Sequence, residues 1–402
     1  MSDAVAARIP PQPWMAAAET RAVLAALGGE GRFVGGCVRD ALLGRMVGDI
    51  DIATPLTPEE VTRRLTAAAI KVVPTGLAHG TVTAVVAGRP FEITTLRRDV
   101  DTDGRHARVA FTDDWAEDAK RRDFTMNALF LDANGTIFDP VGGLGDLRAH
   151  RVRFVGDPAT RIREDVLRIL RFYRFHAHYG EGEADAAARA ACRTLAHLLP
   201  NLSRERVATE LLKLLAAPDP VPALQLMADD GVLKMILPEA SRRDRLAALI
   251  PLEPAPDALR RLAALINGGA DGVSERLRLS TADRERLIIL ATPPTPIDLA
   301  GDEPAQHRAL YRLGADRYCD LVLLRATESG DADRGRALLA LADRWHVPKF
   351  PLRGADVTKA GVPAGPPVGR LLSAIETWWE EGDFRADRAA CLAELKLRLG
   401  QS

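Results

Sequence analysis

The pattern of apolar and polar positions separates the chain into a β-rich part and a helical part. Between residues 32 and 155, short runs rich in Val, Ile, Thr and Phe are separated by Gly, Pro and Asp, which is typical of strands joined by turns in a mixed α/β segment. The runs are RFVGG, DIDIAT, IKVVPTG, TVTAVVAG, FEITTL and RVRFVG. They predict a sheet whose strands are mostly compatible with antiparallel pairing.

Beyond Asp157-Pro158 the apolar residues recur at helical spacing instead. Helices with an apolar stripe are predicted over residues 14–29, 161–178, 185–199, 203–216 and 220–229. Pro- and Gly-rich breaks interrupt the helical pattern that follows, at 251–256, 292–297, 347–353 and 361–369. We therefore expect an α+β protein, in which a head with a mixed or antiparallel sheet precedes an extended helical neck, body and tail.

The length of 402 residues is enough for two to four domains, at about 100–200 residues each. The changes in pattern predict a head at 1–155, a helical neck at 156–220, a helical body at 221–300 and a helical tail at 301–402.

Charge and cysteine content narrow the class of protein. The chain has 54 basic and 55 acidic side chains, a formal net charge of −1, which excludes an indiscriminate binder of polyanions. Residues 151–180 are an exception, because they contain seven arginines and only three acidic residues.

Four cysteines without a CxxC spacing predict reduced thiols. With no secretory signal and no apolar run near the ~20 residues of a membrane helix, we expect a soluble, cytoplasmic protein.

Candidate chemistry begins with two adjacent glycines. Gly35 and Gly36 follow the apolar run RFV, so the backbone can turn tightly there and approach a ligand. The helix predicted directly afterwards would direct its free N–H groups toward an anion. Arg39, in the first turn of that helix, adds a guanidinium suited to phosphate.

Three acidic residues on predicted strands form a candidate metal site. In DIDIAT the strand period of two places the carboxylates of Asp49 and Asp51 on one face. Glu92, in FEITTL, lies on another predicted strand. Carboxylates this close suit Mg²⁺ ions that are shared with substrate phosphates. The three acids together predict a two-metal phosphoryl transfer, in which one ion activates an attacking hydroxyl and the other stabilises the leaving pyrophosphate.

These residues belong to a longer pattern that resembles a known family. GGCVRD followed by GDIDIAT resembles the motif of polymerase-β-like nucleotidyltransferases, specifically the class II branch of tRNA CCA-adding enzymes and bacterial poly(A) polymerases. Four further stretches occur in the family's order, namely DTDGRHARV, RRDFTMNAL, EDVLRILRFYRF and LSRERVATELLKLL. FPLRGADVTKAGVPAGPPVGRLL, near residue 350, resembles the tail of CCA-adding enzymes.

The resemblance implies a binding site for the nucleoside triphosphate. Arg122 would contact the triphosphate together with Gly36 and Arg39. Asp123 and Asn127, in the same motif as Arg122, would help to hold the sugar and the neighbouring loop.

The predicted helix at 161–178 carries polar residues at intervals of three, Asp165, Arg168, Arg171 and Arg174. Cytosine and adenine present an amino donor beside a ring-nitrogen acceptor, whereas uracil and guanine present a carbonyl acceptor beside an N–H donor. An Asp/Arg pair can therefore accept C and A, and it leaves polar groups unpaired against U and G. The resemblance implies this template role for Asp165 and Arg168, with Arg171 and Arg174 reaching phosphate or the tRNA end.

The stretch 98–113 is rich in Asp, Gly and Arg, which predicts a solvated surface loop. In CCA-adding enzymes, which this region resembles, a flexible loop permits the switch from C to A addition. Its DGR element is present as Asp103-Gly104-Arg105.

The resemblance implies an Mg²⁺-dependent enzyme that rebuilds the 3′-terminal CCA of tRNA from CTP and ATP and releases pyrophosphate. Its expected partners are the tRNA 3′ end, CTP and ATP. Three alternatives stay open. A poly(A) polymerase on the same scaffold is disfavoured because the chain has no basic terminal extension, and a CC-adding enzyme is disfavoured by the intact loop. A non-catalytic RNA-binding protein would have no need for three clustered carboxylates.

Overall fold

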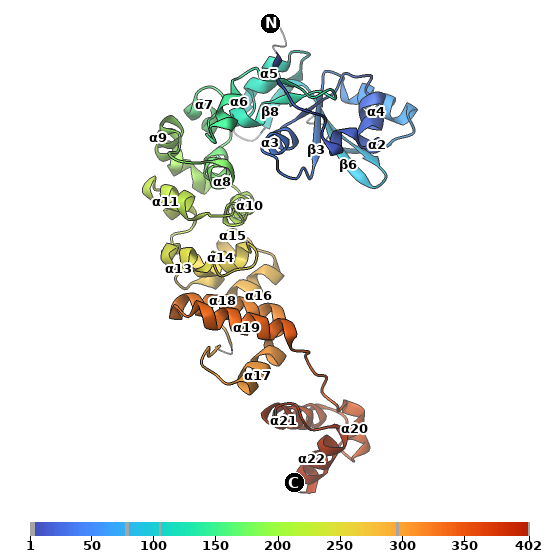
Figure 1. Ribbon diagram of the computed structural model, residues 1–402, viewed down its shortest axis with the longest axis vertical. Helices are drawn as coiled ribbons and strands as arrows, with labels where there is room; N and C mark the ends of the chain where they lie inside the picture. Colours follow the sequence, from blue (N-terminus) through green and yellow to red (C-terminus); the bar gives the residue numbers. More distant parts are fainter. Residues whose placement is uncertain (1–4, 77–79, 104–105, 295–296, 401–402) are drawn as a thin grey trace. The chain divides into compact units, whose positions relative to one another are not determined.

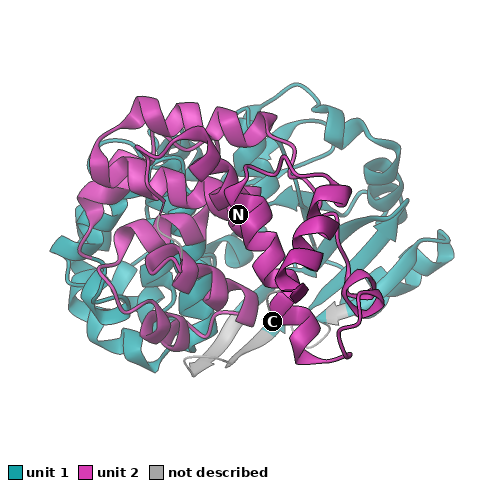
Figure 2. Cartoon of the chain, turned by 90° about the horizontal axis from the view of Figure 1, so that it is seen from below, with its two compact units in different colours: residues 1–240 teal, residues 241–402 magenta. Residues whose placement is uncertain are grey.

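The computed structural model of the chain describes residues 5–76, 80–103, 106–294 and 297–400 (Figure 1). The chain forms two compact units, Met1–Ala240 and Ser241–Ser402, which Figure 2 shows in different colours. The boundary between them lies inside the segment 221–300 that we expected to be the body. The finer division into head, neck, body and tail stays a prediction.

An eight-stranded mixed sheet forms the centre of the first unit. Its strands, in spatial order, are β1 (Val5–Arg8), β10 (Thr136–Phe138), β9 (Phe130–Leu131), β2 (Arg32–Val34), β3 (Ile50–Thr54), β6 (Arg89–Thr95), β5 (Thr81–Val86) and β4 (Lys71–Gly76). Strands β3 and β6 are parallel, and the other neighbouring pairs of this sheet are antiparallel. The α+β architecture with a mixed sheet in the head is confirmed.

A crossover between β3 and β6 makes their parallel pairing possible. The chain passes from β3 through α4 (Pro58–Ala67), β4 and β5 before it returns as β6, as parallel strands require. The Thr57 hydroxyl caps α4 by accepting a hydrogen bond from the Glu60 amide, and Pro58 occupies the first turn. The buried Val61 and Leu65 of α4 belong to a helix that packs on β4, β5 and β6.

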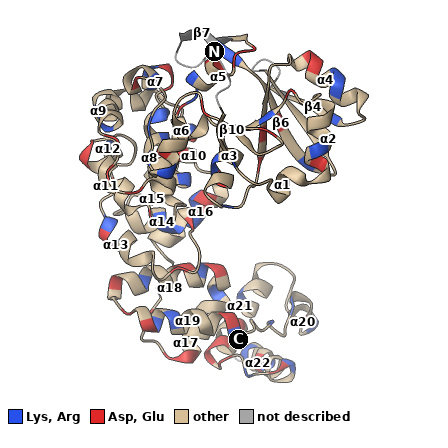
Figure 3. Cartoon of the chain, turned by 45° about the horizontal axis from the view of Figure 1, so that its top comes forward, with Lys and Arg blue, Asp and Glu red and all other residues tan. Residues whose placement is uncertain are grey.

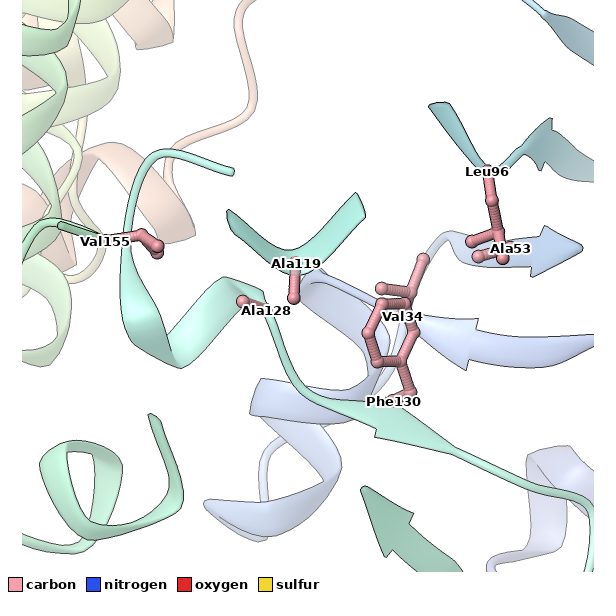
Figure 4. Packing of buried hydrophobic residues seen from close by; sticks show 7 residues of the cluster. All are labelled: Val34, Ala53, Leu96, Ala119, Ala128, Phe130 and Val155. Carbon is pink, nitrogen blue, oxygen red and sulfur yellow. The ribbon is translucent and has the colours of Figure 1, made fainter. Parts of the chain in front are cut away.

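A hydrophobic cluster anchors the strands at the centre of the sheet to α5 (Trp115–Lys120). Its buried members are Val34, Ala53, Leu96, Ala119, Ala128, Phe130 and Val155. Figure 4 shows Val34 of β2 beside Phe130 of β9, and Ala53 of β3 beside Leu96. Full burial of a side chain such as Val or Phe contributes about 1.5–3 kcal/mol, so this cluster holds β3 firmly in place.

The remaining helices of the head are short. They are α1 (Pro13–Ala16), α2 (Ala18–Ala26), α3 (Gly36–Leu42), the 3₁₀ helix η2 (Thr125–Asn127) and α6 (Gly143–Arg148). The predicted helix at 14–29 is therefore two helices, separated at Ala17, and Gly28 and Gly29 follow with positive φ.

Two predictions for the head are wrong. The run RVRFVG at 151–156 is not a strand, since it makes only an isolated bridge between Phe124 and Phe154. The stretch 98–113 is mostly a two-stranded antiparallel ribbon, β7 (Arg97–Asp103) and β8 (His106–Phe111), rather than a loop. Polar composition is compatible with an antiparallel ribbon as well as with a loop, so composition alone does not distinguish the two. Gly104 and Arg105 of the DGR element lie outside the described residues.

Helices follow the sheet to the end of the first unit. They are α7 (Pro158–Glu164), α8 (Arg168–Tyr179), α9 (Ala186–Leu195), η3 (Ala196–Asn201), α10 (Arg204–Leu215), α11 (Val221–Asp229) and α12 (Leu233–Ile236). The predictions at 203–216 and 220–229 are confirmed, whereas the helix predicted at 185–199 is α9 followed directly by the 3₁₀ helix η3. The predicted helix at 161–178 is wrong as a single element, because α7 and α8 are separate helices.

The second unit is helical throughout its described part. Its helices are α13 (Arg243–Leu249), α14 (Ala258–Leu265), α15 (Ala270–Leu277), α16 (Thr281–Ala291), α17 (Glu303–Leu313), α18 (Ala315–Ser329), α19 (Ala332–Arg344), α20 (Gly354–Lys359), α21 (Pro366–Glu381) and α22 (Arg388–Gly400). No helix of the described residues combines the length and apolar composition that crossing a membrane requires.

Candidate functional site

A glycine turn between β2 and α3 lies at the centre of the candidate site. Gly35 has φ 72° and ψ −127°, a conformation that residues with a Cβ rarely adopt. A Cβ placed there would lie 3.8 Å from Asp51 Oδ2 and 3.9 Å from Arg122 Nη1. A Cβ on Gly36 would lie 3.6 Å from Arg39 Nη2. The backbone turn therefore passes beside a carboxylate and two guanidiniums that lie far from one another in the sequence.

The parallel pairing of β3 with β6 brings the acidic residues together. Asp51 and Glu92 are register partners, so their Cα atoms are direct neighbours across the two strands. Asp49 immediately precedes β3, and the strand period of two places it on the Asp51 side. Asp49 and Glu92 are exposed, whereas Asp51 is partly buried.

The electrostatics of Asp51 reflect this crowding. Burial, followed by the negative charge of Glu92, raises the pKa of the Asp51 carboxyl to about 6. Asp49 acts in the same direction, whereas the guanidiniums of Arg122 and Arg39 act against it. Burial and the two neighbouring carboxylates together therefore outweigh the two arginines in their effect on the pKa of Asp51.

The acids have the donor chemistry of an Mg²⁺ site. Among the described residues, no three His, Cys, Asp or Glu side chains converge into a complete metal cage. Mg²⁺ does not need one, because it is usually held by one or two carboxylates together with waters and substrate phosphates. The raised pKa of Asp51 marks a site where a divalent cation would offset negative charge. Asp49 and Asp51, with Glu92 beside them, fit such an ion.

Arg122 is oriented by a buried carboxylate that the sequence analysis missed. Asp118 of α5 is 1% exposed, and its Oδ2 accepts hydrogen bonds from Arg122 Nε at 3.1 Å and Nη2 at 2.8 Å. Its Oδ1 accepts from Arg121 Nε at 2.9 Å. Burial opposes ionisation of Asp118, but the two guanidiniums hold its pKa below the ordinary value. With two nitrogens on Asp118, Arg122 has its third nitrogen, Nη1, near Gly35.

Asp123 and Asn127 lie in a chain of hydrogen bonds that joins the head to α8. Asn127 Nδ2 donates to Asp123 Oδ1 at 3.0 Å, and Arg39 Nη1 donates to Asn127 Oδ1 at 2.7 Å. Asp123 Oδ2 accepts from Arg171 Nε at 2.9 Å and also pairs with Nη2 of the same residue. Burial opposes ionisation of Asp123, but Arg171 and Asn127 hold its pKa below the ordinary value. The predicted contacts of Asp123 and Asn127 with a ribose stay predictions.

Arg39 is enclosed by internal partners. It is 7% exposed, it donates to the Asp40 carboxylate from Nε at 3.0 Å, and it lies over the ring of Tyr179 at 4.1 Å from the centroid. Tyr179 is the last residue of α8, so this cation–π contact fastens the end of α8 to α3. Contact between Arg39 and phosphate stays a prediction, and the structure assigns the side chain a bracing position behind the glycine turn.

The break between α7 and α8 changes the expected placement of Asp165 and Arg168. Asp165 has φ −150° and ψ 105°, and its Oδ1 accepts from the Leu167 amide at 3.1 Å. An Asp side chain that binds a nearby backbone amide offers the chain an alternative to helix, which explains the interruption. Asp165 therefore lies in the break, and Arg168 is the first residue of α8.

Each of these two residues has its own internal partner. Asp165 Oδ2 accepts from Arg206 Nη2 at 2.8 Å. Arg168 Nη1 donates to Glu164 Oε2 at 2.6 Å and to the Arg161 carbonyl at 2.9 Å. Both side chains are only partly buried, with 29% of Asp165 and 14% of Arg168 exposed. Recognition of a base by the pair stays a prediction.

The arginines farther along α8 also have internal partners. Glu210 of α10, 5% exposed, binds Arg174 Nε at 2.5 Å and lies 3.7 Å from Arg171 Nη1. Figure 3 shows basic positions along α8, next to α10. Arg171 thus pairs mainly with Asp123 of the head, and Arg174 pairs with Glu210 of α10, so the contact of these arginines with phosphate or a tRNA end stays a prediction.

Comparison with known proteins identifies the chain. Residues 31–153 match the family described as "Poly A polymerase head domain", and residues 185–243 match "Probable RNA and SrmB- binding site of polymerase A". The chain is 33% identical over 384 residues to CCA tRNA nucleotidyltransferase 1, mitochondrial, of Danio rerio, which covers 90% of this chain and 86% of that protein. The Homo sapiens protein of the same name is 35% identical over 383 residues, covering 91% and 86%.

The chain belongs to the CCA-adding tRNA nucleotidyltransferases. A solved structure supports the assignment, the Bacillus stearothermophilus CCA-adding enzyme in complex with CTP, with a TM-score of 0.77 and 31% identity. The alignment covers 95% of this chain and 97% of that one. The resemblance inferred from the motifs is confirmed, and the chain is an enzyme of the nucleotidyltransferase class.

In this CCA-adding enzyme, several residues that were not predicted from the sequence hold the candidate site residues in place. Asp118 precedes Arg122 by four positions and Glu164 precedes Arg168 by four, a spacing at which helical neighbours meet, so the sequence contained a signal for both. Arg206, Glu210 and Tyr179 act across different helices, and no local pattern points to them.

Proposed function

We propose that this chain adds C, C and A in turn to the 3′ end of tRNA, with CTP and ATP as substrates and pyrophosphate as the released product. The observation that carries the proposal is the register of Asp51 with Glu92 beside the Gly35 turn. It places two carboxylates, a close-approach backbone and Arg122 around one point, in a chain similar to CCA-adding enzymes along most of its length.

The reaction joins the terminal ribose hydroxyl of tRNA to the α-phosphorus of the nucleotide. Asp49 and Asp51 would hold Mg²⁺, with Glu92 as the third carboxylate. When bound, Mg²⁺ lowers the cost of ionising the attacking hydroxyl and offsets charge on the leaving pyrophosphate. Gly35 and Gly36 let the backbone approach the triphosphate without a Cβ between them. Arg122, with Nε and Nη2 on Asp118, directs Nη1 toward the phosphates.

Base choice would fall to Asp165 and Arg168. The carboxylate accepts from the amino group of cytosine or adenine, and the guanidinium donates to the adjacent ring nitrogen. Uracil and guanine reverse that order, so a donor would face a donor and an acceptor would face an acceptor, at a cost of about 1–3 kcal/mol for each group left unpaired. The solved structure at 31% identity is a CCA-adding enzyme in complex with CTP, which supports the binding of a nucleotide by this chain.

Stepwise addition tests the function. Three tRNA transcripts are prepared, lacking CCA, lacking CA or lacking only the final A, and each receives CTP, ATP or both. We expect CTP alone to extend the first by two nucleotides and ATP alone to extend only the third, by one. Long adenosine tails on an unrelated RNA would instead identify a poly(A) polymerase. Arrest after CC with both nucleotides present would identify a CC-adding enzyme.

Matched variants test the residue roles. Asp49→Ala should abolish addition while the thermal unfolding midpoint stays within a few degrees of the wild type. Glu59→Gln, an exposed carboxylate in the first turn of α4, is the control and should keep full activity. Mg²⁺ dependence is measured by addition after EDTA treatment and readdition of the metal. Activity that survives in Asp49→Ala would refute the metal assignment.

A cytoplasmic location belongs to this proposal as well. The Danio rerio and Homo sapiens relatives carry "mitochondrial" in their names, so the compartment of this chain is a question for experiment. Fractionation of cells that produce the protein, followed by the stepwise assay on each fraction, tests the location.

The helical tail at 301–402 is the part that we propose to hold the tRNA outside its 3′ end.

A further inference from the structure

Arg206 occupies a special position next to the proposed base-reading residues. Its guanidinium donates to Asp165 Oδ2 at 2.8 Å, and both side chains stay about one third exposed, at 35% and 29%. We propose that Arg206 determines nucleotide selectivity by holding the Asp165 carboxylate, a hydrogen-bond acceptor, in a fixed orientation. This role rests on the proposed reading of the base by Asp165 and Arg168.

The placement of Arg206 follows from how α10 packs along α8. Arg206 and Glu210 are four positions apart, so they lie on one face of α10, one helical turn from each other. Glu210 binds Arg174 Nε at 2.5 Å, and one turn farther on the Lys213 carbonyl lies 2.8 Å from His178 Nε2. The two contacts fix the register of α10 against α8. The guanidinium of Arg206 is thereby presented to the α7–α8 break by a docked helix.

Both oxygens of Asp165 are held, and each keeps acceptor capacity. Oδ1 accepts from the Leu167 amide at 3.1 Å, and Oδ2 accepts from Arg206. Because a carboxylate offers about four lone-pair positions, two bound donors leave room for the amino group of an incoming base. Two donors on different oxygens also fix the plane of the carboxylate. Asp165 is therefore oriented before the base arrives.

Selectivity against uracil and guanine depends on the direction in which Asp165 presents its oxygens. A carboxylate only accepts, so it cannot pair with the carbonyl of uracil or guanine when it faces that carbonyl. A carboxylate that is free to rotate can turn away from the carbonyl and so avoid the penalty. The guanidinium of Arg206 opposes this rotation, since it binds Oδ2 and holds its direction. Its loss should weaken correct pairing and lower the penalty for incorrect pairing.

The test compares kcat/KM for CTP and UTP on a tRNA transcript that lacks CCA, and for ATP and GTP on a transcript that ends in CC. Wild type, Arg206→Ala and Arg206→Lys are measured with the full chain. Arg204→Ala is the matched control, because Arg204 is exposed and lies on the same first turn of α10. We expect Arg206→Ala to lower both selectivity ratios by about tenfold or more, the loss associated with a hydrogen bond to a charged group. Arg204→Ala should leave the ratios unchanged.

The conservative variant separates this role from a merely structural one. Lysine keeps a charge and a donor but loses the planar fork, so Arg206→Lys should lie between wild type and Arg206→Ala in selectivity. If Arg206→Ala does not fold, as judged by thermal unfolding, the comparison of wild type with Arg206→Lys still tests the proposal. Equal loss of kcat/KM for all four nucleotides, or a lysine that restores no selectivity, would overturn the proposal. A wild type that does not discriminate would instead refute base reading by Asp165 and Arg168 themselves.

Discussion

Replacement of Asp51 by asparagine should abolish nucleotide addition and at the same time make the metal-free protein more stable. The pKa of the Asp51 carboxyl is raised from an ordinary 3.8 to about 6, chiefly by burial and by Glu92. At about 1.4 kcal/mol for each pKa unit, the ionised carboxylate destabilises the folded state by about 3 kcal/mol near neutral pH. Asparagine keeps the shape without the charge, so Asp51→Asn should recover about 1–3 kcal/mol.

The dependence on pH follows from the direction of that shift. Below about pH 4 the carboxyl is protonated in both the folded and the unfolded state, and the variant has no advantage. Between about pH 4 and pH 6 the unfolded state ionises while the folded state retains its proton, so the advantage grows. Above about pH 6 both states are ionised, and the advantage stays constant. Stability of the wild type relative to Asp51→Asn therefore falls as pH rises through this window.

Thermal unfolding in EDTA and in Mg²⁺ measures the effect. For a unit of this size, about 1 kcal/mol corresponds to about 2–4 °C, so the variant should unfold several degrees above the wild type in EDTA at pH 7. Added Mg²⁺ should raise the wild-type midpoint and leave that of Asp51→Asn nearly unchanged, because a ligand stabilises only the state that binds it. The Glu59→Gln control should stay close to wild type under both conditions. A less stable Asp51→Asn, or an advantage independent of pH, would refute the reasoning.

Three further variants test other parts of the site. Gly35→Ala should lower the free energy of unfolding by about 1–3 kcal/mol and reduce kcat, because alanine is strained at φ 72°; an unchanged thermal unfolding midpoint would contradict this. Asp118→Asn breaks a buried ion pair, so urea unfolding should show a loss of about 3–5 kcal/mol and steady-state kinetics a raised KM for CTP and ATP. Tyr179→Ala should cost about 0.5–2 kcal/mol in urea unfolding, whereas Tyr179→Phe, which keeps the ring over Arg39 and loses only the hydrogen bond of the hydroxyl to Asp40, should cost less; equal losses would contradict a stabilising cation–π contact.

The glycine turn and the shared side of Asp49 and Asp51 could be predicted from the sequence because both depend on local geometry. The period of a strand assigns Asp49 and Asp51 to one side without any knowledge of the neighbouring strands. Two adjacent glycines after an apolar run predict a turn, and in the structure Gly35 has a positive φ. The pairing of Asp51 with Glu92 could not be predicted from local sequence, because it depends on the crossover through α4, β4 and β5 that makes β3 and β6 neighbours.

The helix predicted at 161–178 is interrupted because a side-chain hydrogen bond to the backbone competes there with the helical hydrogen bonds. The spacing of Asp165 and Arg168 is compatible with one helix, yet the Asp165 side chain accepts a hydrogen bond from the Leu167 amide and the helix is interrupted.

The ribbon of the head was also not predictable from composition. Nothing in the composition of 98–113 distinguishes a loop from a ribbon whose strands pair mainly with each other. The partners Arg206 and Glu210 depend on the docking of α10, which no pattern within that helix specifies.

The hydrogen-bonded chain behind the glycine turn has a consequence for how the protein is made. Arg39 meets Asn127 across 88 residues of sequence, and Asp123 meets Arg171 across another 48. Contacts between residues so far apart form late, since the long intervening loops must close first. During synthesis the turn therefore emerges long before the residues that brace it. A nucleotide would therefore meet the braced glycine turn only after α8 has been translated and has packed against the head.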